Sequence, residues 1–294
     1  MTDVDAPEAG DGQVRVRVEA SAVNFPDVLL VAGEYQVKVE PPFVPGSEFA
    51  GVVVDTGARV FGSALVGAFA DEIVVAPTSV TPIPDGVDSA TAAAFGVAHR
   101  TAYHVLRSVA TVQAGERVVV LGAGGGVGLA AVQLAAHLGA EAIAVASSDE
   151  KLAVARTLGA AHTVNHRDGD LRAGLGQNDV VVDPVGGDLS EPALRSLRPG
   201  GRFVTVGFAS GTIPRIPLNL VLLKGITIAG FQFLDFATRH PHELRRNEDE
   251  LLALLRDGHA VPHIGARFGL DDAAAALRYV ADGRAIGKVV IDVA

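Results

Sequence analysis

A short apolar run, followed by a glycine-rich loop and a helical pattern, constrains the fold of this chain more than any other feature. The run RVVVLG (117–122) is β-branched and ends at glycine, which is typical of a buried strand. Residues 127–138 carry apolar side chains at near-helical spacing, and Gly139 follows as a stop signal. Free N–H groups and the helix dipole at a helix start stabilise negative charge. This unit therefore predicts a cradle for the pyrophosphate of a dinucleotide.

The glycine spacing departs from the strict GxGxxG pattern, since Ala123 stands at the first position and Gly125 and Gly128 at the other two. The bare pattern is weak, but its place between a predicted strand and a predicted helix strengthens it. The alternative is a tight loop needed only for close helix packing. We favour the dinucleotide site and expect the cofactor to contact Gly125, Gly126, Val127 and Gly128.

Length, charge and hydropathy limit the classes of protein to which the chain can belong. Its 294 residues, 49% of them hydrophobic, suffice for two packed domains. A formal net charge of −10 argues against nucleic acid or an anionic membrane as a partner. No apolar run approaches the roughly 20 residues of a membrane helix, and the acidic start lacks the parts of a signal peptide. We therefore expect a cytoplasmic protein.

The chain contains no cysteine, which removes disulfides, thiol nucleophiles and the usual cysteine ligands of zinc. Its nine histidines form no HExxH pattern, and we interpret His240 and His242 as part of a solvated turn. Metal sites built from histidine and carboxylate stay open on composition alone.

Hydrophobic periodicity divides the chain into a β-rich first third and an α/β remainder. Val14, Val16 and Val18 alternate within the strand expected at 14–23. From about residue 99, predicted strands alternate with helical segments, which implies a parallel sheet with right-handed crossovers. The predicted strands are 117–122, 142–146, 162–165, 179–183, 202–208 and 225–230, and the helical segments between the earlier ones are 127–138, 149–158 and 189–197.

The end of the second predicted strand indicates which coenzyme binds. An NAD site places an acidic side chain there for the ribose 2′-hydroxyl. Here Ser147 and Ser148 follow the strand, Lys151 comes next, and Asp149 is expected in the first turn of a helix. Small hydroxyls and a lysine suit a ribose 2′-phosphate, whereas the alternative is a capped helix with a solvated lysine. We predict a preference for NADPH.

Two further segments complete the predicted cofactor site. His166 and Arg167 follow the third strand and can flank the same phosphate. Ligands in doubly wound sheets lie beyond the carboxyl ends of the strands, so Gly207 and Phe208, at the end of the fifth, are expected near the nicotinamide half. A purely structural turn at these positions is equally compatible with the sequence.

Several segments together resemble one known family. They are VNFPDVLLVAGEYQ (23–36), PPFVPGSEFAG (41–51), TAYHVL (101–106) and the glycine loop. The chain resembles the zinc-free quinone oxidoreductase (zeta-crystallin-like) branch of the medium-chain dehydrogenase/reductase superfamily. The resemblance implies an α/β fold in which a Rossmann doubly wound parallel sheet is inserted into a GroES-like β-rich catalytic domain. We expect the catalytic domain at 1–98, the NADPH-binding domain at 99–234, and a return to the catalytic domain at 235–294.

The resemblance also places the positions of a zinc site. Zinc-dependent relatives carry cysteine where this chain has Asn24, histidine where it has Ser47, and a third ligand near Val97. These replacements would not form a stable tetrahedral site, so no metal is expected. We interpret the neighbouring Glu48 as a structural acid.

By the same resemblance, Asn24, Tyr35 and Thr101 lie near the nicotinamide, and the expected reaction is hydride transfer from NADPH to a quinone without a metal. Tyr35 either donates a proton to the reduced oxygen or only packs. One alternative function is a reductase of α,β-unsaturated carbonyls or enoyl thioesters. Another is a non-enzymatic NADPH-binding protein.

The chain departs from the family pattern at a few places. Relative to the family pattern, we expect a catalytic domain shortened at the N-terminus, with an exposed sheet edge. The alternatives are a start assigned too late and a dimer that covers the gap. His166 stands where tyrosine is common, and we interpret His99 and Arg100 as a salt-bridging pair at the domain junction. Resemblance further implies a homodimer joined along the sheet edge near ITIAGF (226–231).

Overall fold

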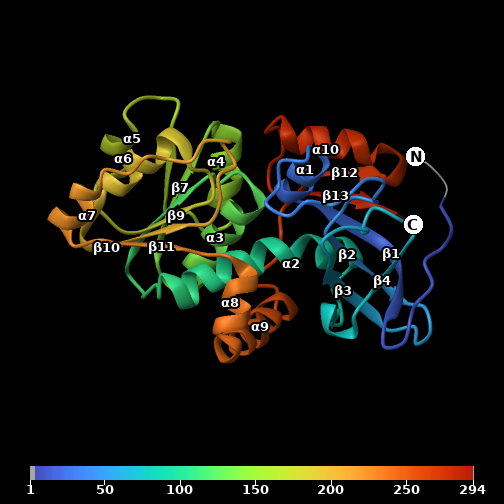
Figure 1. The fold of residues 1–294 in the computed structure, drawn as a ribbon. Coiled ribbons are helices and arrows are strands. Elements are labelled where there is room, and N and C mark those ends of the chain that lie inside the picture. Colours follow the sequence, from blue (N-terminus) through green and yellow to red (C-terminus); the bar gives the residue numbers. More distant parts are fainter. Residues whose placement is uncertain (1–3, 294) are drawn as a thin grey trace. The chain divides into compact units, whose positions relative to one another are not determined.

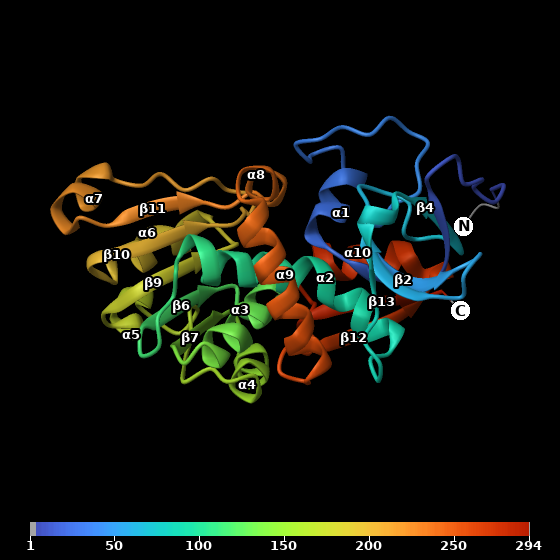
Figure 2. The ribbon, with the colours of Figure 1, turned by 90° about the horizontal axis from the view of Figure 1, so that it is seen from below.

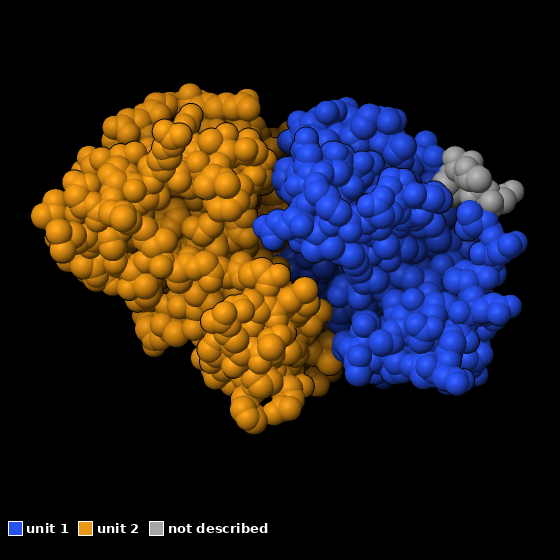
Figure 3. Space-filling model, in the orientation of Figure 1, with its two compact units in different colours: residues 1–98, 261–294 blue, residues 99–260 orange. Residues whose placement is uncertain are grey.

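The computed structural model describes residues 4–293 and divides into two compact units (Figure 3). The first unit combines residues up to 98 with those from 261 onward, and the second unit is formed by residues 99–260. The predicted insertion of one domain into another is therefore confirmed. The predicted boundary at residue 234 is wrong, because residues 235–260 belong to the second unit.

A seven-stranded sheet forms the first unit, with the order β12-β13-β1-β2-β3-β5 and with β4 paired to β1 (Figure 1). The long strand β1 (Val14–Val23) pairs antiparallel with three others, as its alternating valines allow. The remaining strands are β2 (Glu48–Val53), β3 (Arg59–Ser63), β4 (Glu72–Val75), β5 (Val80–Pro82), β12 (Ile264–Gly269) and β13 (Lys288–Asp292).

Short helices cover this sheet. α1 (Phe25–Val31) follows β1 directly, and α10 (Ala273–Ala281) packs against α1, β12 and β13. The single turns are η1 (Pro77–Ser79) and η4 (Leu270–Asp272). The core of the sheet consists of side chains such as Val16, Val18 and Phe49, each at most 1% exposed. Within the described residues, β5 pairs only with β3 and β4 only with β1, which leaves the expected open edges.

Six parallel strands form the sheet of the second unit, in the order β11-β10-β9-β6-β7-β8 (Figure 2). Val118–Leu121 of the central strand are fully buried because helices cover both faces. The strands are β6 (Arg117–Leu121), β7 (Glu141–Ala146), β8 (His162–Asn165), β9 (Asn178–Asp183), β10 (Leu197–Thr205) and β11 (Thr227–Gly230). The helices are α3 (Gly126–His137), α4 (Asp149–Thr157), α5 (Leu171–Leu175), η3 (Gly187–Leu189), α6 (Ser190–Arg195) and α7 (Leu218–Lys224).

The predicted strands and helices of this sheet are confirmed at nearly their predicted bounds. The largest difference is the start of β10, which lies at Leu197 because that residue already pairs with Asn178 before the register shifts.

Helices α8 (Phe233–Arg239) and α9 (Pro241–Arg256) join the second unit through polar contacts with α2 (Ser89–His104). Glu248 of α9 accepts a hydrogen bond from Arg100 Nε at 2.8 Å and pairs with His104 Nε2 at 2.9 Å. Tyr103 donates to Glu250 at 2.8 Å, just before the π-helical turn η2 (Val105–Val109). These contacts explain the corrected boundary. They also confirm Arg100 as an ion-pairing residue, whereas the neighbouring His99 contacts Gln133.

Among the helices of residues 4–293, none combines the length and apolar character needed to cross a bilayer.

Candidate active site

The glycine loop between β6 and α3 has the geometry of a phosphate cradle. Gly122 takes a left-handed φ of 63°, and Gly125 is the N-cap of α3. Leu129 donates the hydrogen bond that closes the first helical turn on the Gly125 carbonyl at 2.9 Å. The N–H groups of Gly126, Val127 and Gly128 precede that bond, and a helix start leaves such groups to outside partners.

Two glycines of this loop have opposite surroundings. A Cβ at Gly128 would lie 2.1 Å from the Gly122 carbonyl oxygen, so only glycine allows this close approach of helix and strand. Gly125 is exposed, and a Cβ there would meet nothing closer than that same oxygen at 3.6 Å. The loop therefore packs tightly against the end of β6 at Gly128, whereas its other side, at Gly125, is open. A loop with one open side of this kind fits a pyrophosphate.

The end of β7 carries the predicted coenzyme-selecting residues. Ser147, Ser148 and Lys151 are half-buried, and the His166 N–H donates to the Ala146 carbonyl at 3.1 Å. The structure thus brings the ends of β7 and β8 together. The Ser148 hydroxyl accepts from the Lys151 N–H at 3.4 Å, so it also caps α4 as the alternative interpretation expected.

Positive charge gathers at this place. Burial lowers the pKa of Lys151 and of His166, and the Arg167 guanidinium lowers both further. The Lys151 stem crosses the phosphate loop, since a Cβ at Gly124 would lie 2.5 Å from its Cδ. Cations that repel one another beside a phosphate loop are stabilised by a bound dianion.

The loops after β9 and β10 form the other end of the predicted cofactor site. Gly207 is half-buried, and the side chain of Phe208 is 38% exposed. The fully buried Asp183 fixes the loop after β9, because its carboxylate accepts from Ser190 Oγ at 2.6 Å and from the Val185 N–H at 2.9 Å. Sequence reasoning missed Asp183, although an acid ending an apolar strand was a possible signal.

In the first unit, Asn24 belongs to a buried polar cluster. Lys288 Nζ donates to Glu48 Oε2 at 2.9 Å and to Asn24 Oδ1 at 2.7 Å. Glu48 Oε1 accepts from the Val97 N–H at 2.6 Å. Lys288 was missed in the sequence, where a lysine opening the apolar run KVVID was the available signal.

Asp27 lies beside this cluster as a second buried acid. Its Oδ2 accepts from the Asn24 N–H at 2.7 Å, whereas Oδ1 has no well-aligned hydrogen-bond partner among residues 4–293. Burial raises the pKa of Asp27 to about 6, although the Ser47 hydroxyl and the Asn24 N–H act in the opposite direction. A proton is therefore held here at mildly acidic pH, up to about pH 6.

The other two predicted catalytic residues lie on different elements. Tyr35 follows α1 in the first unit, is half-buried, and donates its N–H to the Leu29 carbonyl at 3.2 Å. Thr101 is half-buried on α2, in the second unit. Their approach to a nicotinamide stays a prediction.

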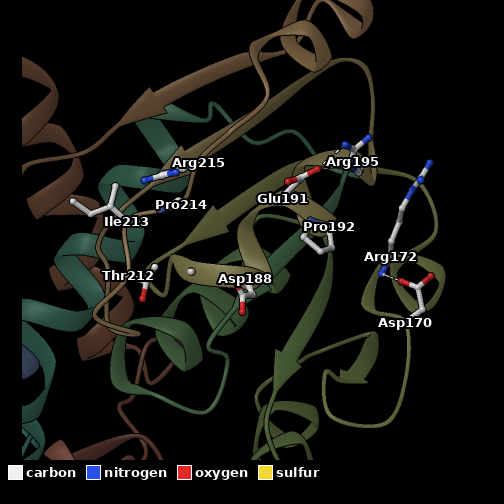
Figure 4. A pocket seen from close by; sticks show the side chains of 11 residues that line it. Asp170, Arg172, Asp188, Glu191, Pro192, Arg195, Thr212, Ile213, Pro214 and Arg215 are labelled. Carbon is white, nitrogen blue, oxygen red and sulfur yellow. Dashed lines mark hydrogen bonds and ion pairs between the residues drawn. The ribbon is translucent and has the colours of Figure 1, made fainter.

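A pocket of about 750 Å³ opens in the second unit away from these residues (Figure 4). Its lining combines three arginines with three acids, and none of the predicted cofactor residues contributes to it. Arg195 and Glu191 pair with one another at 2.6 Å, which leaves little net charge to select a ligand. Across residues 4–293, no group of three or more histidine, aspartate or glutamate side chains has the arrangement of a metal site.

Comparisons with known proteins agree with this architecture. The family model "Alcohol dehydrogenase GroES-like domain" matches residues 10–85, and the model "Zinc-binding dehydrogenase" matches residues 126–252. The second description names a family and not a metal content of this chain.

Similar proteins include quinone oxidoreductases. Quinone oxidoreductase-like protein 2 of Bos taurus is 37% identical over 95% of this chain and 84% of the relative. The quinone oxidoreductase of Thermus thermophilus, solved also in complex with NADPH, is 35% identical with a TM-score of 0.89, over 99% of this chain and 95% of that one. The Streptomyces orinoci spectinabilin polyketide synthase system protein NorB is 37% identical over 95% of this chain but only 13% of the relative. The fold and these similarities show that the chain is an oxidoreductase and belongs to the quinone oxidoreductase branch of the medium-chain dehydrogenase/reductase superfamily.

Proposed function

We propose that this protein transfers hydride from NADPH to a quinone without a metal ion. The observation that carries the proposal is the pair of cations Lys151 and Arg167, with His166 between strand end and loop, beside the open glycine loop. Likeness to a quinone oxidoreductase solved in complex with NADPH supports it. Bound NADPH supplies the hydride from C4 of its nicotinamide, and the residues of the chain bind and orient it.

A metal-free reaction suits the chemistry of the first unit. The Glu48 carboxylate already accepts a hydrogen bond from the buried ammonium group of Lys288 at 2.9 Å. Asn24 and Ser47 supply an amide and a hydroxyl where zinc enzymes of the superfamily are expected to have metal ligands. A quinone needs no Lewis acid, because conjugation spreads the negative charge that develops when hydride adds to it. The reduced quinone oxygen then takes up a proton.

The direct test is the oxidation of NADPH, followed at 340 nm with the purified protein after prolonged dialysis against a chelator. We expect turnover with 1,4-benzoquinone-type acceptors, no loss on chelation, and no gain on adding zinc. Absence of turnover with quinones, or activity that returns only with zinc, contradicts the proposal.

A reductase of α,β-unsaturated carbonyls or enoyl thioesters is the second candidate, because it uses the same hydride geometry. The similarity to a segment of a polyketide synthase protein favours it. Parallel assays with enones and enoyl-CoA distinguish the two, since each predicts the higher kcat/KM for its own acceptor. Binding of NADPH without turnover of any acceptor would instead indicate a non-enzymatic protein.

Replacing Lys151 with alanine is expected to weaken NADPH binding ten- to hundredfold while leaving NADH binding unchanged. The loss corresponds to one charge-assisted contact of about 1.5–3 kcal/mol with the 2′-phosphate. Fluorescence titration with both coenzymes measures it. Arg156→Ala, which removes an exposed cation from the same helix, is the matched control. Equal losses for both coenzymes would remove Lys151 from phosphate recognition.

Tyr35→Phe separates proton donation from packing at that position. If the hydroxyl donates to the reduced oxygen, kcat falls roughly a hundredfold, the lower end of the range for general acid catalysis, with unchanged NADPH affinity. Steady-state kinetics with a quinone measure the effect. Full turnover assigns Tyr35 to packing and leaves the proposed reaction intact.

We also propose that a second copy of this chain covers the β11 edge of the parallel sheet. In the neighbouring helix α7, Leu218, Leu222 and Leu223 are 75%, 82% and 76% exposed. Such a group of large apolar side chains beside an open strand suits a partner with the same surface.

Leu222→Glu is therefore expected to shift the protein from two copies to one in sedimentation equilibrium. Val37→Glu, which changes a 48% exposed side chain in the first unit, is the control and should leave the mass unchanged. A monomeric wild-type protein at working concentration contradicts the expected dimer.

A further inference from the structure

Three residues that are far apart in the sequence meet at one end of the first-unit sheet. β1 lies between β13 and β2, so Asn24, just after β1, comes beside Lys288 and Glu48, which begin those two strands. Glu48 is fully buried and Lys288 is 4% exposed. Removing two charges from water costs several kcal/mol for each ion, and well-packed apolar side chains would often be at least as stable. The pair therefore calls for a role besides stability.

The contacts of the pair show that it orients the Asn24 carboxamide. Lys288 Nζ donates to Asn24 Oδ1 at 2.7 Å, and Asn24 Nδ2 donates to Glu48 Oε2 at 3.0 Å. A flipped amide would direct its NH₂ group at the ammonium and its oxygen at the carboxylate. The opposite charges of the two partners thus allow one orientation only.

Glu48 is itself held from a third direction. Its Oε1 accepts from the Val97 N–H at 2.6 Å, and a Cβ at Gly96 would lie 2.9 Å from that oxygen. The carboxylate therefore cannot turn away from Asn24 without losing a hydrogen bond. The frame around the amide is rigid on both sides.

This orientation leaves one N–H of Asn24 weakly engaged. Besides Glu48, its Nδ2 has the Ala22 carbonyl and the Ser47 hydroxyl as neighbours, each at the long distance of 3.4 Å. Asn24 is 8% exposed, so the amide is held mostly away from water. A fixed donor without a strong partner in such surroundings stabilises an oxygen on which negative charge develops.

We propose that Lys288 and Glu48 are positioning residues that fix Asn24 as the hydrogen-bond donor to the carbonyl oxygen of the hydride acceptor. This inference rests on the proposed reductase function and deepens it. The acceptor must then be a carbonyl compound whose oxygen becomes anionic as hydride arrives, and the two charged residues act only through the amide.

The test is a double-mutant cycle between the pair and Asn24. Lys288→Met alone would leave a buried carboxylate without its cation and is liable to unfold. Lys288→Met/Glu48→Gln removes both charges together and keeps an acceptor for the Val97 N–H. In this variant the amide introduced at position 48 offers Asn24 a donor in place of an acceptor, so the fixed orientation is lost.

We expect Lys288→Met/Glu48→Gln to bind NADPH with unchanged affinity, because the predicted coenzyme residues lie in the second unit. Its kcat with a quinone should fall at least tenfold, and Asn24→Ala should show a similar loss. Adding the two substitutions to Asn24→Ala should cost no further activity, which is the signature of residues that act through one group. Lys288→Arg should retain most of the activity.

A purely structural role predicts another pattern. The thermal midpoint and the fraction of molecules that bind NADPH would fall, while kcat per binding site and the isotope effect with deuterated NADPH stay at wild-type values. That result, or losses that add in the triple variant, overturns the positioning role while the reductase function stands. Failure of the wild-type protein to reduce any carbonyl acceptor overturns both.

Discussion

Gly128→Ala is expected to destabilise the second unit by roughly 3 kcal/mol, at the upper end of the cost of overpacking, and to abolish NADPH binding. The added methyl group would lie 2.1 Å from the Gly122 carbonyl oxygen and 2.7 Å from its carbon. Both are backbone atoms at the end of β6, so no side chain can move aside. Helix α3 must shift away from the strand, and its free N–H groups move with it.

Gly125→Ala is the matched control, three residues earlier in the same loop. Gly125 has φ −92° and ψ 174°, which alanine adopts without strain. Its added methyl group would meet the nearest protein atom at 3.6 Å. We expect wild-type stability for this variant but loss of NADPH binding, because the methyl group occupies the open front of the cradle.

Urea unfolding and fluorescence titration of the two variants measure both effects. The pair separates packing from ligand contact, since only Gly128→Ala should lose stability and both should lose the coenzyme. A Gly125→Ala protein that binds NADPH normally would show that the pyrophosphate does not lie on this loop.

Asp27→Asn is expected to change the pH dependence of stability by up to about 3 kcal/mol. Burial raises the pKa of Asp27 to about 6, from an ordinary value of 3.8. Between these values the folded protein binds the proton that the unfolded chain has released. The free energy of unfolding therefore falls as the pH rises from about 4 to about 6, and the loss is complete above pH 6 or so.

The asparagine variant has no proton to lose. In the wild-type protein the Asn24 N–H donates to Asp27 Oδ2 at 2.7 Å, as part of the capping box of α1. The amide oxygen of the variant can still accept this hydrogen bond. Relative to wild type, the variant should thus become progressively more stable from about pH 4 to about pH 6, with little further change up to pH 8. Urea unfolding at several pH values gives this difference, and Asp55→Asn, in an exposed turn, controls for a general charge effect. A difference that does not vary with pH would show that Asp27 is ionised throughout.

The elements that could be predicted from the sequence are those whose structure depends on the residues of one short segment alone. The strand at Val14–Val23 was predicted at its observed bounds because its valines alternate. The parallel strands and α3 were predicted because apolar runs and glycines mark their ends. The same features predicted the glycine loop and the serines after β7.

Features that depend on distant partners were not predicted. Lys288 and Glu48 are 240 positions apart, and nothing local in either segment shows that the two meet. Helix α9 was placed in the wrong unit for the same reason, since Arg100 and Glu248 are 148 positions apart. Periodicity finds buried faces, but the pairing of buried charges becomes visible only in the folded chain.

The antiparallel pairing of β1 with β13 has a consequence for synthesis on the ribosome. β1 is synthesised before the inserted unit, whereas β13 is synthesised after it. The inserted unit has all its strands by residue 260 and can fold while the N-terminal segment still waits for its final neighbour. During that interval Glu48 is without its cation, so we expect chaperones to recognise the nascent segment that contains β1 and β2 and to release it once β13 has docked.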